Sequence, residues 1–208
     1  CSRRHRCSDI LLAHHADDNA ETVLLNLLRG SAGLKGIRYR SKVLVDRKTL
    51  TLVRPLLGVR RKEIDAYLEA RRIPYREDAS NKEPFTPRNR LRSEIIPLLE
   101  DLMTRDVIPA IVRAAESSLE DQEALDELLL VLDLVDPQDR LFLPKLRKLP
   151  EALQRRALFL YLKDSGISDL SRELIERCLT LIDPGSPARV NLPGGLHCCR
   201  RAGRILVE

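Results

Sequence analysis

The feature that most constrains the fold is an apolar run, then a polar cluster, then helical periodicity, all within residues 8–30. Residues 8–13, SDILLA, form a short apolar segment typical of a buried strand. From Asp18 onward, apolar side chains recur at helical spacing until Gly30, where a helix would end. These side chains are Val23, Leu24, Leu27 and Leu28. A strand, a turn and a helix in this order form a half-unit of an α/β fold, which is the fold class we expect.

The rest of the first half continues this mixed pattern. Two β-branched runs around a polar turn predict a β-hairpin over residues 43–55, and residues 59–72 predict an amphipathic helix. Residues 74–92 contain three prolines and many polar side chains, which favours a loop over most of this segment. We expect a helix from about Asn89, bent or ended near Pro97.

The second half is mainly helical in its pattern. The predicted helices cover residues 106–135, 143–166 and 169–182. Residues 188–208 predict a hairpin that turns at Gly194 and Gly195, followed by a third short strand. We therefore expect an α/β domain in residues 1–105 and a mainly helical domain with a small terminal hairpin in residues 106–208.

Composition narrows the class of partner. The 208 residues carry 36 Lys and Arg against 31 Asp and Glu, and this net charge of +5 favours an anionic partner such as nucleic acid. The chain has three Phe, four Tyr and no Trp, which argues against a platform for stacking single-stranded bases. Arg and Lys would instead contact the backbone of a nucleic acid and recognise its shape. No apolar run approaches the roughly 18 residues that cross a bilayer, and the N-terminal residues lack the apolar core of a secretory signal. We expect a cytoplasmic protein with no membrane partner.

The five cysteines do not form a zinc-binding pattern. There is no CxxC, and the adjacent Cys198 and Cys199 would point to opposite faces of a strand. Unpaired thiols in a reducing compartment are the favoured interpretation.

A cluster of histidine and acidic side chains lies between the predicted strand and the predicted helix. His14, His15 and Asp17 follow the strand, at the sheet edge where open α/β folds bind ligands. Asp18 and Glu21 fit a capping box, which accounts for both residues without any function. Histidine with carboxylates also suits a divalent metal, and carboxylates suit a cationic substrate group beside a histidine that contacts phosphate. From the residues alone, all three interpretations stay open.

Arginines gather in a second polar segment. Arg88, Arg90 and Arg92 lie near Asn81 and alternate with other residues, so the three cannot share one helical face. Guanidinium groups match phosphate oxygens, which suits a polyphosphate or a tRNA backbone. A solvated charged surface is the alternative, and it is also the favoured interpretation for each of the other basic runs, VRRK among them.

Three segments resemble the tRNA(Ile)-lysidine synthase family of PP-loop ATPases in their order and spacing. They are AHHADDNAETVLLNLLRGSAGLKGI, RPLL and EDASNKEPFTPRNRLRSEIIPLL. The later segments LPKLRKLPEALQRRAL and VNLPGG are similar to that family's second, substrate-binding domain. The resemblance covers nearly the whole chain. It implies the C-terminal portion of a Rossmann-like PP-loop ATPase domain in residues 1–105 and a domain that binds substrate or tRNA in residues 106–208.

The resemblance implies a specific reaction. Enzymes of this family use ATP to adenylate the wobble cytidine of an isoleucine tRNA with a CAU anticodon. The ε-amine of free lysine then attacks, which gives lysidine, AMP and pyrophosphate. The implied cofactors are ATP and Mg²⁺, with no metal site formed by the protein itself, and a homodimer is compatible with the pattern.

The family's site residues carry over to matching positions of this sequence. Asp18 and Glu21 match positions that hold the charged groups of lysine, with His14 beside them. Arg92 and Asn81 match positions that line the nucleotide and the reaction centre. The expected catalytic residues are His14, Asp18 and Arg92, the expected substrate-binding residues are Asp18, Glu21 and Asn81, and the expected nucleic-acid-binding residues are Arg88 and Arg90.

The sequence departs from the family pattern at one point. The ATP-binding signature, a Ser-Gly-Gly-x-Asp-Ser loop after the first strand, belongs upstream of Cys1, and no glycine-rich phosphate cradle occurs in these residues. We therefore expect a chain that is truncated on its N-terminal side and inactive alone.

Three other functions are alternatives. A tRNA thiolase of the same superfamily also carries a histidine-aspartate motif after a strand, but such enzymes commonly use paired cysteines. A non-catalytic module would bind tRNA without ATP turnover. A metal phosphoesterase built on His14, His15 and the aspartates would release phosphate without lysine.

Overall fold

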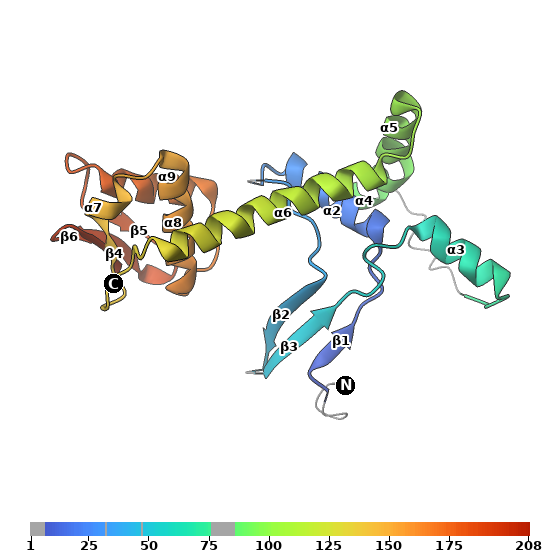
Figure 1. The fold of residues 1–208 in the computed structure, drawn as a ribbon, viewed down its shortest axis with the longest axis horizontal. Helices are drawn as coiled ribbons and strands as arrows, with labels where there is room; N and C mark the ends of the chain where they lie inside the picture. Colours follow the sequence, from blue (N-terminus) through green and yellow to red (C-terminus); the bar gives the residue numbers. More distant parts are fainter. Residues whose placement is uncertain (1–6, 32, 47, 76–85) are drawn as a thin grey trace. The chain divides into compact units, whose positions relative to one another are not determined.

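The chain folds into two compact units, residues 1–120 and 121–208. The computed structural model describes residues 7–31, 33–46, 48–75 and 86–208. Helix α6, Ile108–Val131, belongs to both units, since the division falls within it (Figure 1). The domain boundary predicted near residue 105 lies shortly before this helix. In the described part of the chain, no helix combines the length and the apolar character needed to span a bilayer.

The first unit contains a three-stranded sheet in the order β1-β3-β2 (Figure 1). Its strands are β1 (Asp9–Leu11), β2 (Arg40–Val45) and β3 (Lys48–Val53). β1 runs parallel to β3 with Asp9 opposite Thr51, whereas β2 and β3 are antiparallel. The predicted hairpin is therefore confirmed, and the parallel pair confirms the α/β class.

The prediction of a buried strand in residues 8–13 is correct for the strand and wrong for its burial. Leu11 is 71% exposed, whereas Leu50 and Val53 of β3 are buried. The reason is position in the sheet: β3 is central, and β1 pairs with β3 alone among the described strands. Short apolar runs identify strands but do not say which strand is at the edge.

The helices of the first unit lie near their predicted positions. They are α2 (Ala16–Leu28), α3 (Arg61–Ala70), α4 (Pro87–Arg90), the π-helical turn η2 (Leu91–Ile95) and α5 (Ile96–Met103). The chain stays helical from Pro87 to Met103, and the π turn ends two residues before Pro97, as expected where a proline disturbs the helical hydrogen bonds. Buried side chains from α2, α5, α6 and the residue just before α6 form the core of this unit. They are Ala16, Ala20, Ile96, Val107, Ile108 and Val112.

A buried amide holds the loop after α2 against that helix. Asn19 is 4% exposed, and its Oδ1 accepts a hydrogen bond from the backbone N–H of Ile37 at 2.6 Å. A Cβ atom on Gly36 would lie 2.4 Å from the same oxygen. Glycine is therefore required at this position, because only a residue without a side chain allows the backbone to approach so closely.

The second unit packs helices against a four-stranded antiparallel sheet in the order β4-β7-β6-β5. The strands are β4 (Leu141–Phe142), β5 (Arg189–Asn191), β6 (His197–Arg201) and β7 (Arg204–Val207). The helices after α6 are α7 (Leu143–Leu146), α8 (Glu151–Asp164) and α9 (Arg172–Leu179), the last followed by the 3₁₀ turn η3 (Thr180–Ile182). A further 3₁₀ turn, η4 (Pro193–Gly195), joins β5 to β6, so the predicted terminal hairpin and third strand are confirmed. Cys178, Cys198 and Cys199 are unpaired and buried here.

The prediction of a single helix over residues 143–166 is wrong. This segment forms two helices, α7 and α8, which are separated just before Pro150 because proline lacks the N–H that a continuous helix would need. The short strand β4 was also not predicted. It has two residues, and its pairing partner Ile205 lies far away in the sequence, so no local pattern could show it.

Candidate active site

The polar clusters meet at one edge of the first unit's sheet. Because β1 and β3 are parallel, the segments that follow them leave the sheet at the same edge. Two backbone hydrogen bonds hold these segments together: Leu12 N–H donates to Val53 O, and Ala16 N–H donates to Val59 O, both at 2.9 Å. The start of α2 and the start of α3 therefore lie close to each other.

The capping box of α2 involves His15 and Asp18. The Asp18 carboxylate accepts from the backbone N–H of His15 at 3.0 Å, and His15 Nδ1 accepts from the backbone N–H of Asp18 at 3.3 Å. The capping box predicted for Asp18 and Glu21 is thus wrong, because the helix is capped at His15, three residues earlier than the pattern suggested. Glu21 lies within the helix and has no role in its cap.

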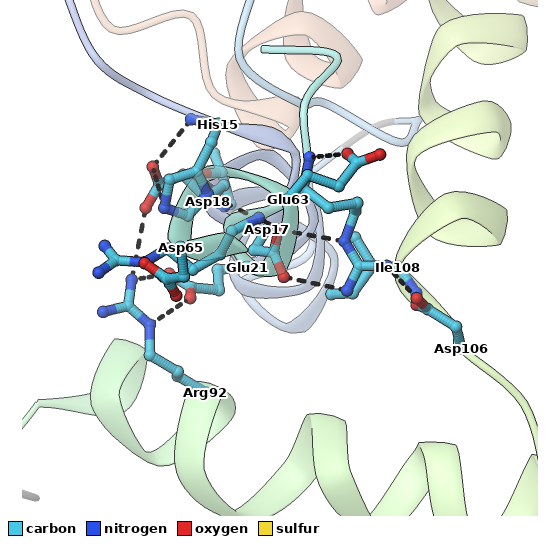
Figure 2. A network of polar contacts seen from close by, with 12 residues as sticks. His15, Asp17, Asp18, Glu21, Glu63, Asp65, Arg92, Asp106 and Ile108 are labelled. Atoms are coloured by element: carbon cyan, nitrogen blue, oxygen red, sulfur yellow. Dashed lines mark hydrogen bonds and ion pairs between the residues drawn. The ribbon is translucent and has the colours of Figure 1, made fainter. Parts of the chain in front are cut away.

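The centre of the site is a pair of carboxylates bound by two arginines, and Figure 2 shows both carboxylates with one of the arginines, Arg92. Asp18 and Glu21 lie three residues apart, so they project from the same side of α2. Glu21 is 1% exposed, which would be costly for an ion without partners. Arg88 Nε donates to Glu21 Oε2 at 2.7 Å, and Arg88 Nη2 donates to Asp18 Oδ1 at 2.9 Å. Arg92 Nε donates to Glu21 Oε1 at 2.6 Å.

The electrostatics of the pair follow from these contacts. The hydrogen bond to Glu21 raises the pKa of Arg92, and this effect exceeds the opposite effect of burial. Two carboxylates and two guanidinium groups give this cluster no net charge. A site of this kind is built to hold cationic groups against buried carboxylates.

The other predicted site residues have no hydrogen bond or ion pair with these two carboxylates, or they lie outside the described residues. Arg90 points elsewhere: its guanidinium contacts Glu94, four residues further on, at 2.9 Å, and its side chain is 63% exposed. His14 has a buried Nδ1 for which the described residues supply no hydrogen-bond partner. Asn81 lies outside the described residues, so its predicted role stays a prediction.

A second ion-pair network, which the sequence did not predict, lies next to the first (Figure 2). Arg60 Nε and Nη2 form a fork on the Asp17 carboxylate, both at 3.1 Å, and the Arg61 backbone N–H donates to Asp17 at 2.8 Å. Arg60 Nη1 also donates to Asp106, which accepts from Lys62 Nζ at 2.8 Å. The solvated surface predicted for the VRRK run is thus wrong for Arg60, whose side chain is 14% exposed.

This Arg60 network ties α2, α3 and α6 together. Asp106 Oδ1 accepts from the backbone N–H of Ile108 at 3.1 Å and so satisfies a free donor at the start of α6. Burial raises the pKa of Asp17, but the hydrogen bonds from Arg60 and from the Arg61 backbone, together with the positive charge of Arg60, lower the pKa overall. The same balance holds the pKa of Asp106 at about 2, where Lys62 and Arg60 together outweigh burial.

The low pKa of Asp106 predicts a pH dependence of stability. Because the folded-state pKa of about 2 lies below the ordinary value of 3.8, the ionised carboxylate stabilises the fold above pH 3.8, and this stabilisation is lost as the pH falls from 3.8 toward 2. In Asp106→Asn, the free energy of unfolding should be lower at pH 6 and should change less between pH 4 and pH 2. Urea unfolding across this pH range measures both effects. Asp101→Asn, at an exposed aspartate of α5, should keep the wild-type profile; equal profiles for both variants would contradict the account.

Among the described residues, no three His, Cys, Asp or Glu side chains are grouped so that they could hold a metal ion. The carboxylates at the start of α2 are instead engaged by arginines and backbone N–H groups.

Two family models match the chain in the order of its two units. The model described as a PP-loop domain matches residues 2–99, and the model described as the TilS substrate binding domain matches residues 141–206. Neither match extends over the middle of the chain, residues 100–140.

Curated relatives match over almost the full chain. The tRNA(Ile)-lysidine synthase of Thermus thermophilus is 38% identical over 205 residues, which cover 95% of this chain and 37% of that protein. The protein of the same name from Rhodococcus erythropolis is 37% identical over 207 residues, with 95% and 61% covered. The one from Streptomyces coelicolor is 32% identical over 211 residues, with 99% and 59% covered. The chain thus spans 37% to 61% of the length of these relatives.

Proposed function

Because the chain belongs to the tRNA(Ile)-lysidine synthase family of PP-loop ATPases, we propose that it forms part of an enzyme that joins lysine to tRNA. The proposed acceptor is the wobble cytidine of an isoleucine tRNA with a CAU anticodon. The observation that carries the proposal is the carboxylate pair of α2. Asp18 and Glu21 lie at the ligand-binding edge of the sheet and are arranged to hold a cationic group.

The proposed reaction has two steps. In the first, the carbonyl oxygen of the cytosine attacks the α-phosphorus of ATP, and the bond to pyrophosphate breaks. In the second, the ε-nitrogen of lysine attacks the activated ring carbon, the carbon–oxygen bond breaks, and AMP leaves with that oxygen. Adenylation converts a poor leaving oxygen into a good one, which makes the displacement by an amine feasible.

Within this scheme, the carboxylate pair positions lysine. Asp18 and Glu21 bind the ε-ammonium group of lysine and orient it toward the reaction centre, where Arg92 would contact the nucleotide. The neighbouring carboxylates also favour the protonated form of this amine, so the nucleophile must lose a proton before it attacks. His14 is the proposed acceptor of this proton. Its support is a buried ring nitrogen without a hydrogen-bond partner among the described residues.

The second unit is the proposed tRNA-binding part. Its support is the match to the substrate binding domain. Arg90, whose side chain is 63% exposed, is one of several arginines of the first unit with enough exposure to contact a phosphate. Mg²⁺ would accompany the phosphates of ATP.

The experiment that tests this function measures lysine transfer. The full gene product, including the coding region upstream of Cys1, is incubated with labelled lysine, ATP, Mg²⁺ and the CAU-anticodon tRNA, and the label in the RNA is counted. The 208-residue chain is assayed in parallel. We expect label in the tRNA with the full gene product and none with the 208-residue chain. ATP consumption with tRNA but without lysine transfer would contradict the proposal and favour a tRNA thiolase.

A further inference from the structure

Arg88 occupies the space between the two carboxylates of α2. It donates one N–H to Glu21 Oε2 at 2.7 Å and another to Asp18 Oδ1 at 2.9 Å, so a single guanidinium bridges both groups. A lysine ammonium is a compact cation with three N–H donors and can make the same two contacts. A cation of the protein itself therefore lies where the cationic group of the substrate would bind.

Arg92 contacts the pair in a different way. Its Nε and Nη2 form a fork on Glu21 alone, at 2.6 and 3.1 Å, and its Nη2 lies 3.4 Å from Asp18 Oδ1. A fork on one carboxylate is a stronger and more specific arrangement than one N–H to each of two carboxylates. Of the two arginines, Arg88 is thus the one that can leave while buried Glu21 keeps a charged partner.

The charge balance of the cluster favours an exchange of one arginine for the incoming ammonium group. The two carboxylates and the two guanidinium groups already cancel, so an added ammonium would place a third positive charge beside a Glu21 side chain that is 1% exposed. Like charges at this separation repel, and little water is present at Glu21 to screen them. If one arginine moves away, the ammonium group binds at this pair without the excess positive charge.

From these contacts we propose that Arg88 is an internal counter-ion that occupies the ammonium subsite of lysine and is displaced when lysine binds. The inference rests on the proposed function and deepens it. The side chain of Arg88 is 38% exposed, so it has solvent to move into. Once released, its guanidinium is free to bind a phosphate oxygen, and lysine binding thereby makes a phosphate-binding arginine available.

The test measures lysine binding to the full gene product by calorimetry, without ATP and without tRNA. In Arg88→Gln, the competing cation is gone, so lysine should bind more tightly, with a dissociation constant about 3- to 10-fold lower, the range expected for loss of a half-exposed competing ion pair. Arg88→Lys keeps a competing cation and should stay near the wild-type value.

Arg155→Gln provides the matched control. Arg155 also bridges two carboxylates, with Nε donating to Glu176 at 2.7 Å and Nη2 donating to Glu151, but it lies in the second unit. The same loss of one positive charge there should leave lysine binding unchanged, which separates local competition from a general effect of charge.

The outcomes distinguish the inference from the proposed function. If the wild type binds lysine and Arg88→Gln binds it equally or more weakly, Arg88 is a structural or lysine-binding residue, and the inference is overturned. An equal gain in affinity in Arg155→Gln also overturns it. If neither the wild type nor any variant binds lysine, the proposed lysine subsite itself is wrong, and the inference falls with it.

Discussion

Replacing Glu21 by Gln should reduce lysine transfer to tRNA at least about 100-fold, the size of effect expected when a reacting group is held out of position. The neutral amide keeps the shape of the side chain but removes the charge that holds the ammonium. Adenylation does not involve lysine, so release of pyrophosphate in its absence should be retained. Lysine transfer and pyrophosphate release, measured on the same preparation, separate the two steps.

Glu94→Gln is the matched control for this prediction. Glu94 also pairs with an arginine, Arg90, at 2.9 Å, but its side chain is 46% exposed. This variant should transfer lysine at the wild-type rate. If Glu21→Gln transferred lysine as fast as Glu94→Gln, Glu21 would be a structural residue, and the proposed lysine subsite would be wrong.

The largest expected effect on stability is in the second unit, where Leu158→Ala should lower the free energy of unfolding by about 3–5 kcal/mol. Leu158 is fully buried on α8 and belongs to the core cluster that includes Leu143, Leu181 and Ile205. Truncation would leave a cavity that the neighbouring helices and sheet can fill only in part. Denaturant unfolding, followed by circular dichroism, measures the change.

Leu130→Ala tests whether burial is the cause. Leu130 is 78% exposed on α6, so its truncation should change the free energy of unfolding by less than about 0.5 kcal/mol. A similar loss for both variants would show that the core of this unit does not lie where the structure places it.

Local sequence patterns predicted most of the helices and strands because their causes are local. The apolar spacing in α2 and the β-branched runs of β2 and β3 each need only a few neighbouring residues to be recognised. The spacing of Arg88, Arg90 and Arg92, which prevents them from sharing one helical face, is also a local feature of the sequence. The structure confirms it, since Arg88 and Arg92 contact α2 whereas Arg90 contacts Glu94.

The failures concern contacts between residues that are distant in the sequence. Arg60 lies 43 residues from Asp17 and 46 from Asp106, and nothing in a basic run shows that one of its members is buried in a fork. The capping box failed for a different reason. A capping box needs an acidic residue three positions after the cap, and both His15 with Asp18 and Asp18 with Glu21 have this spacing. The second pair was preferred because histidine is not among the commonest capping residues.

The sequence also could not show that the two polar clusters bind each other. Asp18 and Glu21 were predicted to hold lysine, and Arg88 to bind nucleic acid, as separate sites. In the structure Arg88 contacts both carboxylates across about 70 residues of sequence. This pairing is what links the proposed binding of an amine to the proposed binding of a phosphate.

The central claim is that the full gene product builds lysidine on its tRNA, and the most direct test is the chemical identity of the wobble nucleoside. The CAU-anticodon isoleucine tRNA, after reaction with ATP and lysine, is digested to nucleosides and analysed by mass spectrometry. The account predicts a cytidine in which lysine replaces the ring carbonyl oxygen, and its absence when lysine is omitted. A thiolated cytidine, or an unmodified one despite bound tRNA and consumed ATP, would contradict the account.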